Sequence, residues 1–198
     1  MINFVVGNLF ESDAFALVNT VNCEGYMGKG IAYQFKLRYP NMNAEYVKKC
    51  RSHQLQPGML HSYLEDSKLI VNFPTKNKWR EKSKMEYIVS GLDALIDLIK
   101  EKHITSIAIP PLGSGNGGLN WSEVKQVIIQ KLSCLSEDVD IYIYEPSRNY
   151  QAIPVAEPQL SLSALILMQI KFHLLPDKIH FNKICLQKTA YFMNVLSN

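Results

Sequence analysis

Residues 104–123 read ITSIAIPPLGSGNGGLNWSE, and this stretch decides the fold class. The isoleucine-rich segment 104–109 predicts a buried strand, and four glycines within residues 113–118 predict a tight turn after it. Asn120 with Glu123 three residues later has the spacing of a helix cap. A strand, a turn and a helix in this order are the unit from which α/β sheets are built, so we expect an α/β domain.

The same alternation extends over the first 145 residues or so. Strands are predicted at residues 2–6, 16–19, 59–64, 68–73, 104–109 and 140–144, and helices at 31–39 and 44–51. Ser83 and Glu86 have the spacing of a capping box, which predicts a further helix with its apolar face at Ile88, Leu92, Leu95, Ile96 and Ile99. The helix after Asn120 has its apolar face at Val124, Val127, Ile128 and Leu132. This pattern predicts a mixed or mostly parallel sheet.

The composition is that of a folded protein with one domain and a small appendage. The chain has 198 residues, of which 47% are hydrophobic and 20% charged, so a disordered or fibrous chain is excluded. A net charge of +3 is too small for a histone-like binder, so contact with nucleic acid would need a local basic patch. The cysteines show no CxxC pair, and we expect neither a disulfide framework nor a bound metal. With no signal peptide or long apolar run, we expect a cytoplasmic location without membrane contact.

The last fifty residues differ in texture from the rest. Pro146, Pro154 and Pro158 fall within thirteen residues, which predicts a linker over residues 151–160 between a domain at 1–150 and a tail at 161–198. Two apolar helical segments are predicted in the tail, at 161–175 and 183–196. Such helices must dock on the domain, on a partner or on residues beyond this sequence.

Two glycine-rich loops are the candidates for phosphate binding. Residues 113–118 and residues 25–30 each lie between a predicted strand and a predicted helix, where backbone N–H groups and the helix dipole favour an anion. If both strands end at one edge of the sheet, the loops can hold a diphosphate between them. The sequence Val18-Asn19-Thr20-Val21-Asn22 adds amide groups suited to a ribose diol. The alternative is that the glycines form ordinary turns and the asparagines are structural.

A basic run follows the strand at 68–73. Residues 72–84 contain five basic side chains around Trp79, which is typical of a surface that contacts a nucleic-acid backbone and stacks on its bases. The alternative is a solvated loop that enters a helix. Lys76 stands apart, because it follows the strand end directly and is expected at the same edge as the glycine loops.

Taken in order, VGNL at 6–9, VNTVN at 18–22, GKGIA at 28–32, NFPTK at 72–76 and PPLGSG at 110–115 resemble a macrodomain. More narrowly, they are similar to the macrodomain of DarG-type antitoxins, whose members remove the ADP-ribose that DarT toxins attach to thymidine in single-stranded DNA. The resemblance implies a three-layer α/β/α fold and ADP-ribose as ligand and product, with no cofactor. It also implies that the tail begins a toxin-binding region, for which Leu186–Phe192 matches best.

The resemblance assigns roles to individual residues. Lys76 matches the catalytic lysine, and Asn8 replaces the acidic residue that contacts adenine in most macrodomains. The predicted ADP-ribose site comprises Gly7, Asn8, Leu9, Asn19, Thr20, Val21, Asn22, Gly28, Lys29, Gly30, Ile31, Thr75, Gly113, Ser114, Gly115, Asn116, Gly117, Gly118 and Tyr144. The predicted DNA contacts are Lys78, Trp79, Arg80, Lys82 and Lys84.

Several functions are compatible with these residues. A neutral Lys76 amine can attack the anomeric carbon and form a Schiff base, or its ammonium can protonate the departing thymine. A desolvated, electropositive loop is expected to lower the pKa of Lys76, and Lys78 and Arg80 are expected to contribute by like-charge repulsion. Three alternatives are an ADP-ribose reader without catalysis, a hydrolase of glutamate-linked or O-acetyl-ADP-ribose, and an interaction protein that acts through its tail.

Overall fold

The computed structural model describes residues 1–146 together with Ile166 and Gln169, both of which are helical. The chain divides into two units, Met1–Ala152 and Ile153–Asn198, and the first contains every predicted site residue. The expected linker at 151–160 and the expected tail, except for those two residues, lie outside the described part. No helix in the described part is long and apolar enough to cross a membrane.

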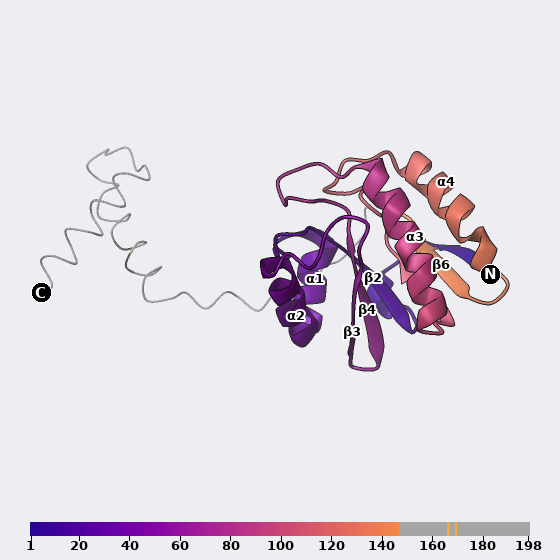
Figure 1. The fold of residues 1–198 in the computed structure, drawn as a ribbon, viewed down its shortest axis with the longest axis horizontal. Helices are drawn as coiled ribbons and strands as arrows, with labels where there is room; N and C mark the ends of the chain where they lie inside the picture. Colours follow the sequence, from indigo (N-terminus) through magenta and orange to yellow (C-terminus); the bar gives the residue numbers. More distant parts are fainter. Residues whose placement is uncertain (147–165, 167–168, 170–198) are drawn as a thin grey trace, which may run out of the picture. The chain divides into compact units, whose positions relative to one another are not determined.

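A six-stranded mixed sheet forms the centre of the first unit (Figure 1). Its strands are β1 (Ile2–Val5), β2 (Ala16–Val21), β3 (His61–Glu65), β4 (Lys68–Pro74), β5 (Ser106–Ile109) and β6 (Asp140–Tyr144), in the spatial order β1-β6-β5-β2-β4-β3. All neighbouring pairs are parallel except β3 and β4, which form an antiparallel hairpin. The predicted mixed, mostly parallel sheet is therefore confirmed.

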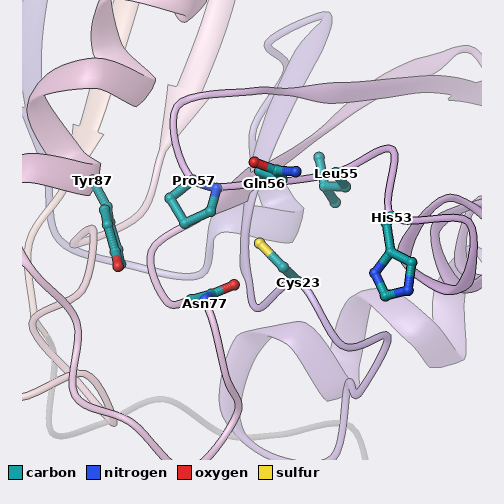
Figure 2. A pocket seen from close by; sticks show the side chains of 7 residues that line it. All are labelled: Cys23, His53, Leu55, Gln56, Pro57, Asn77 and Tyr87. Carbon is teal, nitrogen blue, oxygen red and sulfur yellow. The ribbon is translucent and has the colours of Figure 1, made fainter.

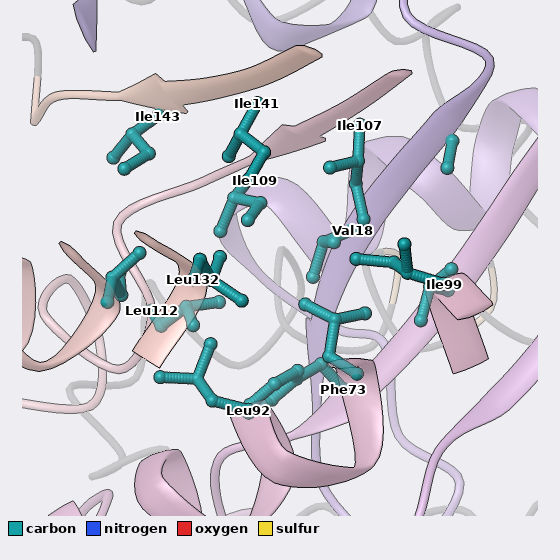
Figure 3. Close-up of a cluster of buried hydrophobic side chains, with 14 of the residues drawn as sticks. Val18, Phe73, Leu92, Ile99, Ile107, Ile109, Leu112, Leu132, Ile141 and Ile143 are labelled. Carbon is teal, nitrogen blue, oxygen red and sulfur yellow. The ribbon is translucent and has the colours of Figure 1, made fainter. Parts of the chain in front are cut away.

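Helices cover both faces of the sheet, which gives the three layers implied by the resemblance. The helices are α1 (Gly30–Arg38), α2 (Pro40–Arg51), α3 (Met85–Glu101) and α4 (Trp121–Leu132), with short 3-10 turns η1 (Leu9–Glu11) and η2 (Ser133–Leu135). One apolar cluster joins the sheet to α3 and α4, and Figure 3 shows Phe73, Leu92 and Ile109 within it. The other cluster joins the opposite face to α1 and α2. Because both faces are buried, the central strands β2, β4 and β5 are buried almost throughout rather than at alternate positions.

The predicted capping box before α3 is wrong. The helix begins at Met85 with Lys84 at the N-cap position, and Ser83 does not cap it. The backbone N–H of Ser83 instead donates to the Gly117 carbonyl at 3.0 Å, and its hydroxyl is buried without a hydrogen-bond partner in the described residues. Ser83 is held against residues 113–118, the second glycine loop in chain order, and is therefore unavailable to cap the helix. The cap at Asn120 is confirmed, since its side chain accepts from the Ser122 N–H at 3.0 Å.

Helix α2 begins four residues before the predicted start. Pro40 occupies the first helical position, and the Glu65 carboxylate accepts hydrogen bonds from the backbone N–H groups of Asn41 at 3.2 Å and Met42 at 2.7 Å. These N–H groups have no partner inside the helix, so a carboxylate from the end of β3 satisfies them. A local pattern could not reveal this cap, because Glu65 lies more than twenty residues away along the chain.

Candidate functional site at the carboxyl edge of the sheet

The predicted site loops meet at one edge of the sheet. Strands β1, β6, β5, β2 and β4 run parallel, so the segments after them all emerge on the same side. In open α/β sheets this edge is where ligands bind. The condition set by the sequence, that both glycine loops come after strands ending at the same edge, is therefore met.

The chain segments after β2 and β4 stay paired beyond the strands. Thr75 N–H donates to the Val21 carbonyl, and Cys23 N–H donates to the Asn77 carbonyl, both at 3.0 Å. The Cys23 thiol lies 3.6 Å from the Lys76 carbonyl. These contacts fix the backbone on both sides of Lys76 against the segment that contains Asn22.

Lys76 connects this paired segment to the second glycine loop. Its Nζ donates to the Asn116 carbonyl at 2.8 Å. Partial burial lowers the pKa of the Lys76 ammonium from its usual value. The expected desolvation of Lys76 is therefore confirmed as the cause, and the expected contribution of Lys78 and Arg80 is wrong.

Asn22 fixes the shape of the first glycine loop, residues 25–30. Its Oδ1 accepts from the N–H groups of Glu24 at 2.9 Å and Tyr26 at 3.3 Å, while its Nδ2 donates to the Tyr26 carbonyl at 2.6 Å. The Tyr46 hydroxyl donates to the Asn22 carbonyl at 2.7 Å. In this structure the Asn22 side chain, predicted to contact the distal ribose, bonds within its own loop.

The second glycine loop is held by backbone bonds. Within it, Gly118 N–H donates to the Gly115 carbonyl and Leu119 N–H to the Gly113 carbonyl. Gly117 lies where the loop backbone and Ser83 approach closely, because a Cβ there would clash with the Gly113 carbonyl and the Ser83 hydroxyl. The Ser114 hydroxyl donates to the Leu112 carbonyl at 3.2 Å, so it is turned into the loop.

The two glycine loops approach each other at Gly30 and Asn116. Gly30 has a φ of 60°, and a Cβ at that position would lie 3.0 Å from the Asn116 side-chain nitrogen. Asn116 therefore contacts the start of α1 with its side chain and Lys76 with its carbonyl. Gly28 and Lys29 are exposed beside this contact, and Ile31 is half-buried.

Asn19 is a core residue in this structure. It is 0% exposed, and its Nδ2 donates to Asn72 Oδ1 at 2.8 Å, so its predicted contact with ADP-ribose stays a prediction. Asn72 Nδ2 in turn lies 3.0 Å from His61 Nδ1, and burial lowers the pKa of that histidine. Asn19 Oδ1 has no hydrogen-bond partner in the described residues. Thr20, next to it, is half-buried.

The predicted adenine end lies at β1 and β6. Asn8 caps η1, with Oδ1 accepting from Phe10 N–H at 3.2 Å and Nδ2 donating to Glu11 at 3.0 Å. Gly7 is exposed beside it. Three further predicted residues, Leu9, Val21 and Tyr144, belong to the apolar cluster under α1 and α2, and Thr75 is a buried polar residue.

The predicted DNA contacts form an exposed surface beside the first glycine loop. The Trp79 side chain is 48% exposed, and the Arg80 guanidinium lies 4.5 Å from its ring centroid. The backbone N–H of Trp79 donates to the Glu24 carboxylate at 2.8 Å. Lys84 lies 5.2 Å from the Tyr87 ring centroid and pairs with Glu86, and these contacts raise the pKa of its ammonium. Lys78 and Lys82 are exposed.

Comparison with known proteins agrees with this geometry. A family model described as Macro domain matches residues 18–128, which include Asn22, Lys76 and both glycine loops. The chain belongs to the macro domain family. The solved macrodomain of Mycobacterium tuberculosis DarG superposes with a TM-score of 0.73 at 48% identity, over 74% of this chain and 99% of that structure.

Two further relatives match a larger share of this chain than that structure does. The DNA ADP-ribosyl glycohydrolase of Thermus aquaticus is 43% identical over 98% of this chain, which covers 56% of that relative. Thermosipho africanus DarTG, solved in complex with ADP-ribose, matches with a TM-score of 0.69 at 30% identity, over 83% of this chain and 46% of that one. The chain thus spans about half the length of the curated relatives it matches.

Sequence reasoning missed several residues that position this macrodomain's site. Glu24 ties the first glycine loop to Trp79, and Tyr46 from α2 fixes the Asn22 carbonyl. Asn72 carried a usable signal, because an amide inside a buried strand needs a polar partner. Glu24 and Tyr46 carried no such signal, since each looks like an ordinary surface or core residue in the sequence.

Proposed function

We propose that this macrodomain is an ADP-ribosyl glycohydrolase that removes ADP-ribose from thymidine in single-stranded DNA. The observation that carries the proposal is the position of Lys76, whose Nζ reaches the second glycine loop at 2.8 Å from the Asn116 carbonyl. An amine there is beside the loops that would hold the diphosphate of ADP-ribose. The relatives named DNA ADP-ribosyl glycohydrolase support ADP-ribosylated DNA as the class of substrate.

In the proposed reaction the neutral Lys76 amine attacks the anomeric carbon of the distal ribose. The new C–N bond forms as the bond from that carbon to the thymine ring nitrogen breaks, and thymine leaves with the electron pair and takes up a proton. Opening of the ribose gives a Schiff base on Lys76, which water hydrolyses to ADP-ribose and the free amine. Burial favours this chemistry, because it lowers the pKa of Lys76 and increases the fraction of neutral amine. The second version has the Lys76 ammonium donate its proton to the leaving thymine.

Two measurements separate these versions. Borohydride added during turnover should leave ADP-ribose on Lys76 only if the amine is the nucleophile. The rate should also rise with pH until it passes the lowered pKa of Lys76, because only the deprotonated amine attacks. If the ammonium acts as the acid, the rate should fall over the same range and borohydride should trap nothing.

Cys23 is a poor rival nucleophile beside the site. Burial, with small contributions from Cys50 and Glu24, raises the pKa of its thiol to about 12. The thiolate is the reactive form of cysteine, so Cys23 stays unreactive near neutral pH. We therefore assign the chemistry to Lys76 alone and propose that the reaction needs no cofactor.

The alternatives differ in what the protein does to the bound ADP-ribose. A reader binds ADP-ribose-modified DNA without releasing ADP-ribose, whereas a hydrolase with another acceptor prefers glutamate-linked or O-acetyl-ADP-ribose. Incubating the protein with all three substrates at equal concentration tests this. We expect the modified thymidine to react fastest, and a fastest reaction with either other substrate would overturn the choice of thymidine.

We further propose an antitoxin role in the cytoplasm against a DarT-like toxin, with DNA bound at Lys78, Trp79, Arg80, Lys82 and Lys84. The exposed position of these side chains beside Lys76 supports the DNA surface. Contacts to phosphates make affinity fall with salt, so turnover of a modified oligonucleotide should be salt-sensitive while ADP-ribose affinity stays constant. Removing residues 152–198 and measuring toxin binding tests the role of the tail.

A further inference from the structure

A cavity of about 450 Å³ lies beside the predicted reaction centre and contains none of the predicted site residues. Its walls come from the segment after β2, the segment after β4, the loop after α2, and the first turn of α3. Figure 2 shows Tyr87 at one end, His53 at the other, and Cys23 and Asn77 between them. The volume lies within the range of about 300–1,000 Å³ seen for small-molecule sites.

The cavity shares its backbone with the site of Lys76. Cys23 directly follows Asn22 and Asn77 directly follows Lys76, so one peptide unit separates each lining residue from a predicted site residue. The Cys23 N–H bonds to the Asn77 carbonyl at 3.0 Å, which holds both against the paired ends of β2 and β4. A single strand bound at Lys76 would therefore pass next to this cavity.

The lining suits a nucleobase. The side-chain amides of Gln56 and Asn77 each offer donors and an acceptor, and neither forms a hydrogen bond within the described part of the chain. Tyr87 contributes an aromatic ring, and Leu55 and Pro57 contribute apolar surface. Proteins that bind single strands combine amide contacts to base edges with stacking on aromatic rings in this way.

Two lysines adjoin residues that line the cavity. Lys78 follows Asn77 in the chain, and Lys84 lies over the Tyr87 ring at 5.2 Å from its centroid. The nearby carboxylates have partners, since Glu24 accepts from Trp79 N–H and Glu86 pairs with Lys84. Cys23 adds no charge, because burial keeps its thiol protonated by raising its pKa to about 12. Lys78 is therefore the cation that a phosphate beside a bound base would meet, because Glu86 offsets the charge of Lys84.

We propose that this cavity binds the base of a nucleotide that neighbours the ADP-ribosylated thymidine. The inference rests on the proposed function, because it needs a modified single strand in the adjacent site. It assigns strand recognition to Gln56 and Tyr87 in addition to the basic surface. An ADP-ribosylated oligonucleotide should therefore bind more tightly than ADP-ribosyl-thymidine alone.

Equilibrium binding to the full-length Lys76→Ala protein tests this without depending on turnover. The probes are ADP-ribosylated single-stranded trinucleotides with the modified thymidine in the middle and either normal or abasic neighbours on the 5′ or 3′ side. Removing one of the two neighbouring bases should weaken binding roughly tenfold, the loss expected for one stacked base. Equal affinity for the normal and both abasic probes would overturn the proposal.

Variants in the Lys76→Ala background locate the effect. Tyr87→Leu and Gln56→Ala should weaken binding of the normal probe and leave binding of the sensitive abasic probe unchanged. Tyr87→Phe should retain the ring and the affinity, and Gln130→Ala on the exposed surface of α4 is the matched amide control. Equal weakening of both probes, or weakened binding of ADP-ribosyl-thymidine, would show that the cavity does not hold a neighbouring base.

Hydrolysis of ADP-ribosyl-thymidine by the protein with Lys76 intact tests the proposed function separately. If that nucleoside is not hydrolysed while the probe affinities differ as expected, the activity is wrong and the base site stands. If it is hydrolysed while all probes bind equally, the activity stands and the base site is wrong.

Discussion

The two glycine-rich loops look alike in the sequence and are held in different ways in the structure. Residues 113–118 are braced by backbone hydrogen bonds within the loop and by Ser83 N–H, which donates to the Gly117 carbonyl. Residues 22–30 are held mainly by side chains, above all that of Asn22, which bonds to the backbone of Glu24 and Tyr26. The Tyr46 hydroxyl and the Glu24 carboxylate add one bond each. One loop is shaped by its glycines and the other by an asparagine that precedes them.

This difference bears on how each loop can act on a ligand. The braced loop offers a fixed set of backbone groups, whereas the first loop can change if the Asn22 side chain exchanges its internal bonds for bonds to a ribose. Asn116 joins the two, because its side chain lies against Gly30 and its carbonyl accepts from Lys76. We therefore expect substitutions in the two loops to differ in how much they lower the free energy of unfolding and in which contacts they disturb.

The largest loss of stability is expected for Gly117→Ala. The added methyl would clash with the Gly113 carbonyl and the Ser83 hydroxyl. The backbone hydrogen bond from Ser83 to Gly117 keeps the two segments from moving apart to relieve this clash. Overpacking of this kind should lower the free energy of unfolding by about 3 kcal/mol. Thermal unfolding checks this, with Gly115→Ala as the matched control, since a Cβ at Gly115 meets nothing within 4 Å. Equal unfolding temperatures for the two variants would show that the loop is not rigidly braced.

A smaller loss is expected for Asn22→Ala. The substitution removes the acceptor for the N–H groups of Glu24 and Tyr26, so we expect a loss of about 2 kcal/mol. Asn22→Asp keeps that acceptor and should lose less. Chemical denaturation of the three proteins measures the difference, and an Asn22→Ala protein as stable as the original would mean that the side chain does not hold the loop.

The smallest loss is expected where the loops touch. Gly30→Ala places a side chain at a φ of 60° and against the Asn116 amide, which should cost about 1 kcal/mol of unfolding free energy. Gly28→Ala is the control, because a Cβ there meets nothing within 4 Å. A cost at Gly28 equal to that at Gly30 would argue against the contact between the loops.

The sequence could predict the elements and the edge where the loops gather, because isoleucine-rich strands, glycine turns and the cap at Asn120 are local signals. It could not predict contacts between distant segments. Ser83 has the spacing of a cap but is held by Gly117, and the start of α2 depends on Glu65 from β3. Asn19 illustrates the same limit, since its burial against Asn72 follows from the pairing of β2 with β4.

The structure shows what the predicted site residues contact, and their roles toward a ligand stay predictions. Lys76 lies at the junction of the loops and its pKa is lowered by burial as expected, without the expected contribution of neighbouring charge. Asn8 and Asn22 were predicted as ligand contacts, and both bond within their own segments in this structure. Asparagine serves caps, turns and ligands equally well, so its type alone does not decide between them.

The most direct test of Lys76 as the catalytic residue is the single-turnover release of ADP-ribose from thymidine-modified single-stranded DNA, with and without Lys76. We expect Lys76→Ala to slow release by about 1,000-fold or more, because nucleophile and proton donor are both removed. Its affinity for free ADP-ribose should stay within about threefold of the original, because the backbone groups of both glycine loops are kept and the lost ammonium bonds to the Asn116 carbonyl. Release at the same rate by both proteins would contradict the catalytic role of Lys76.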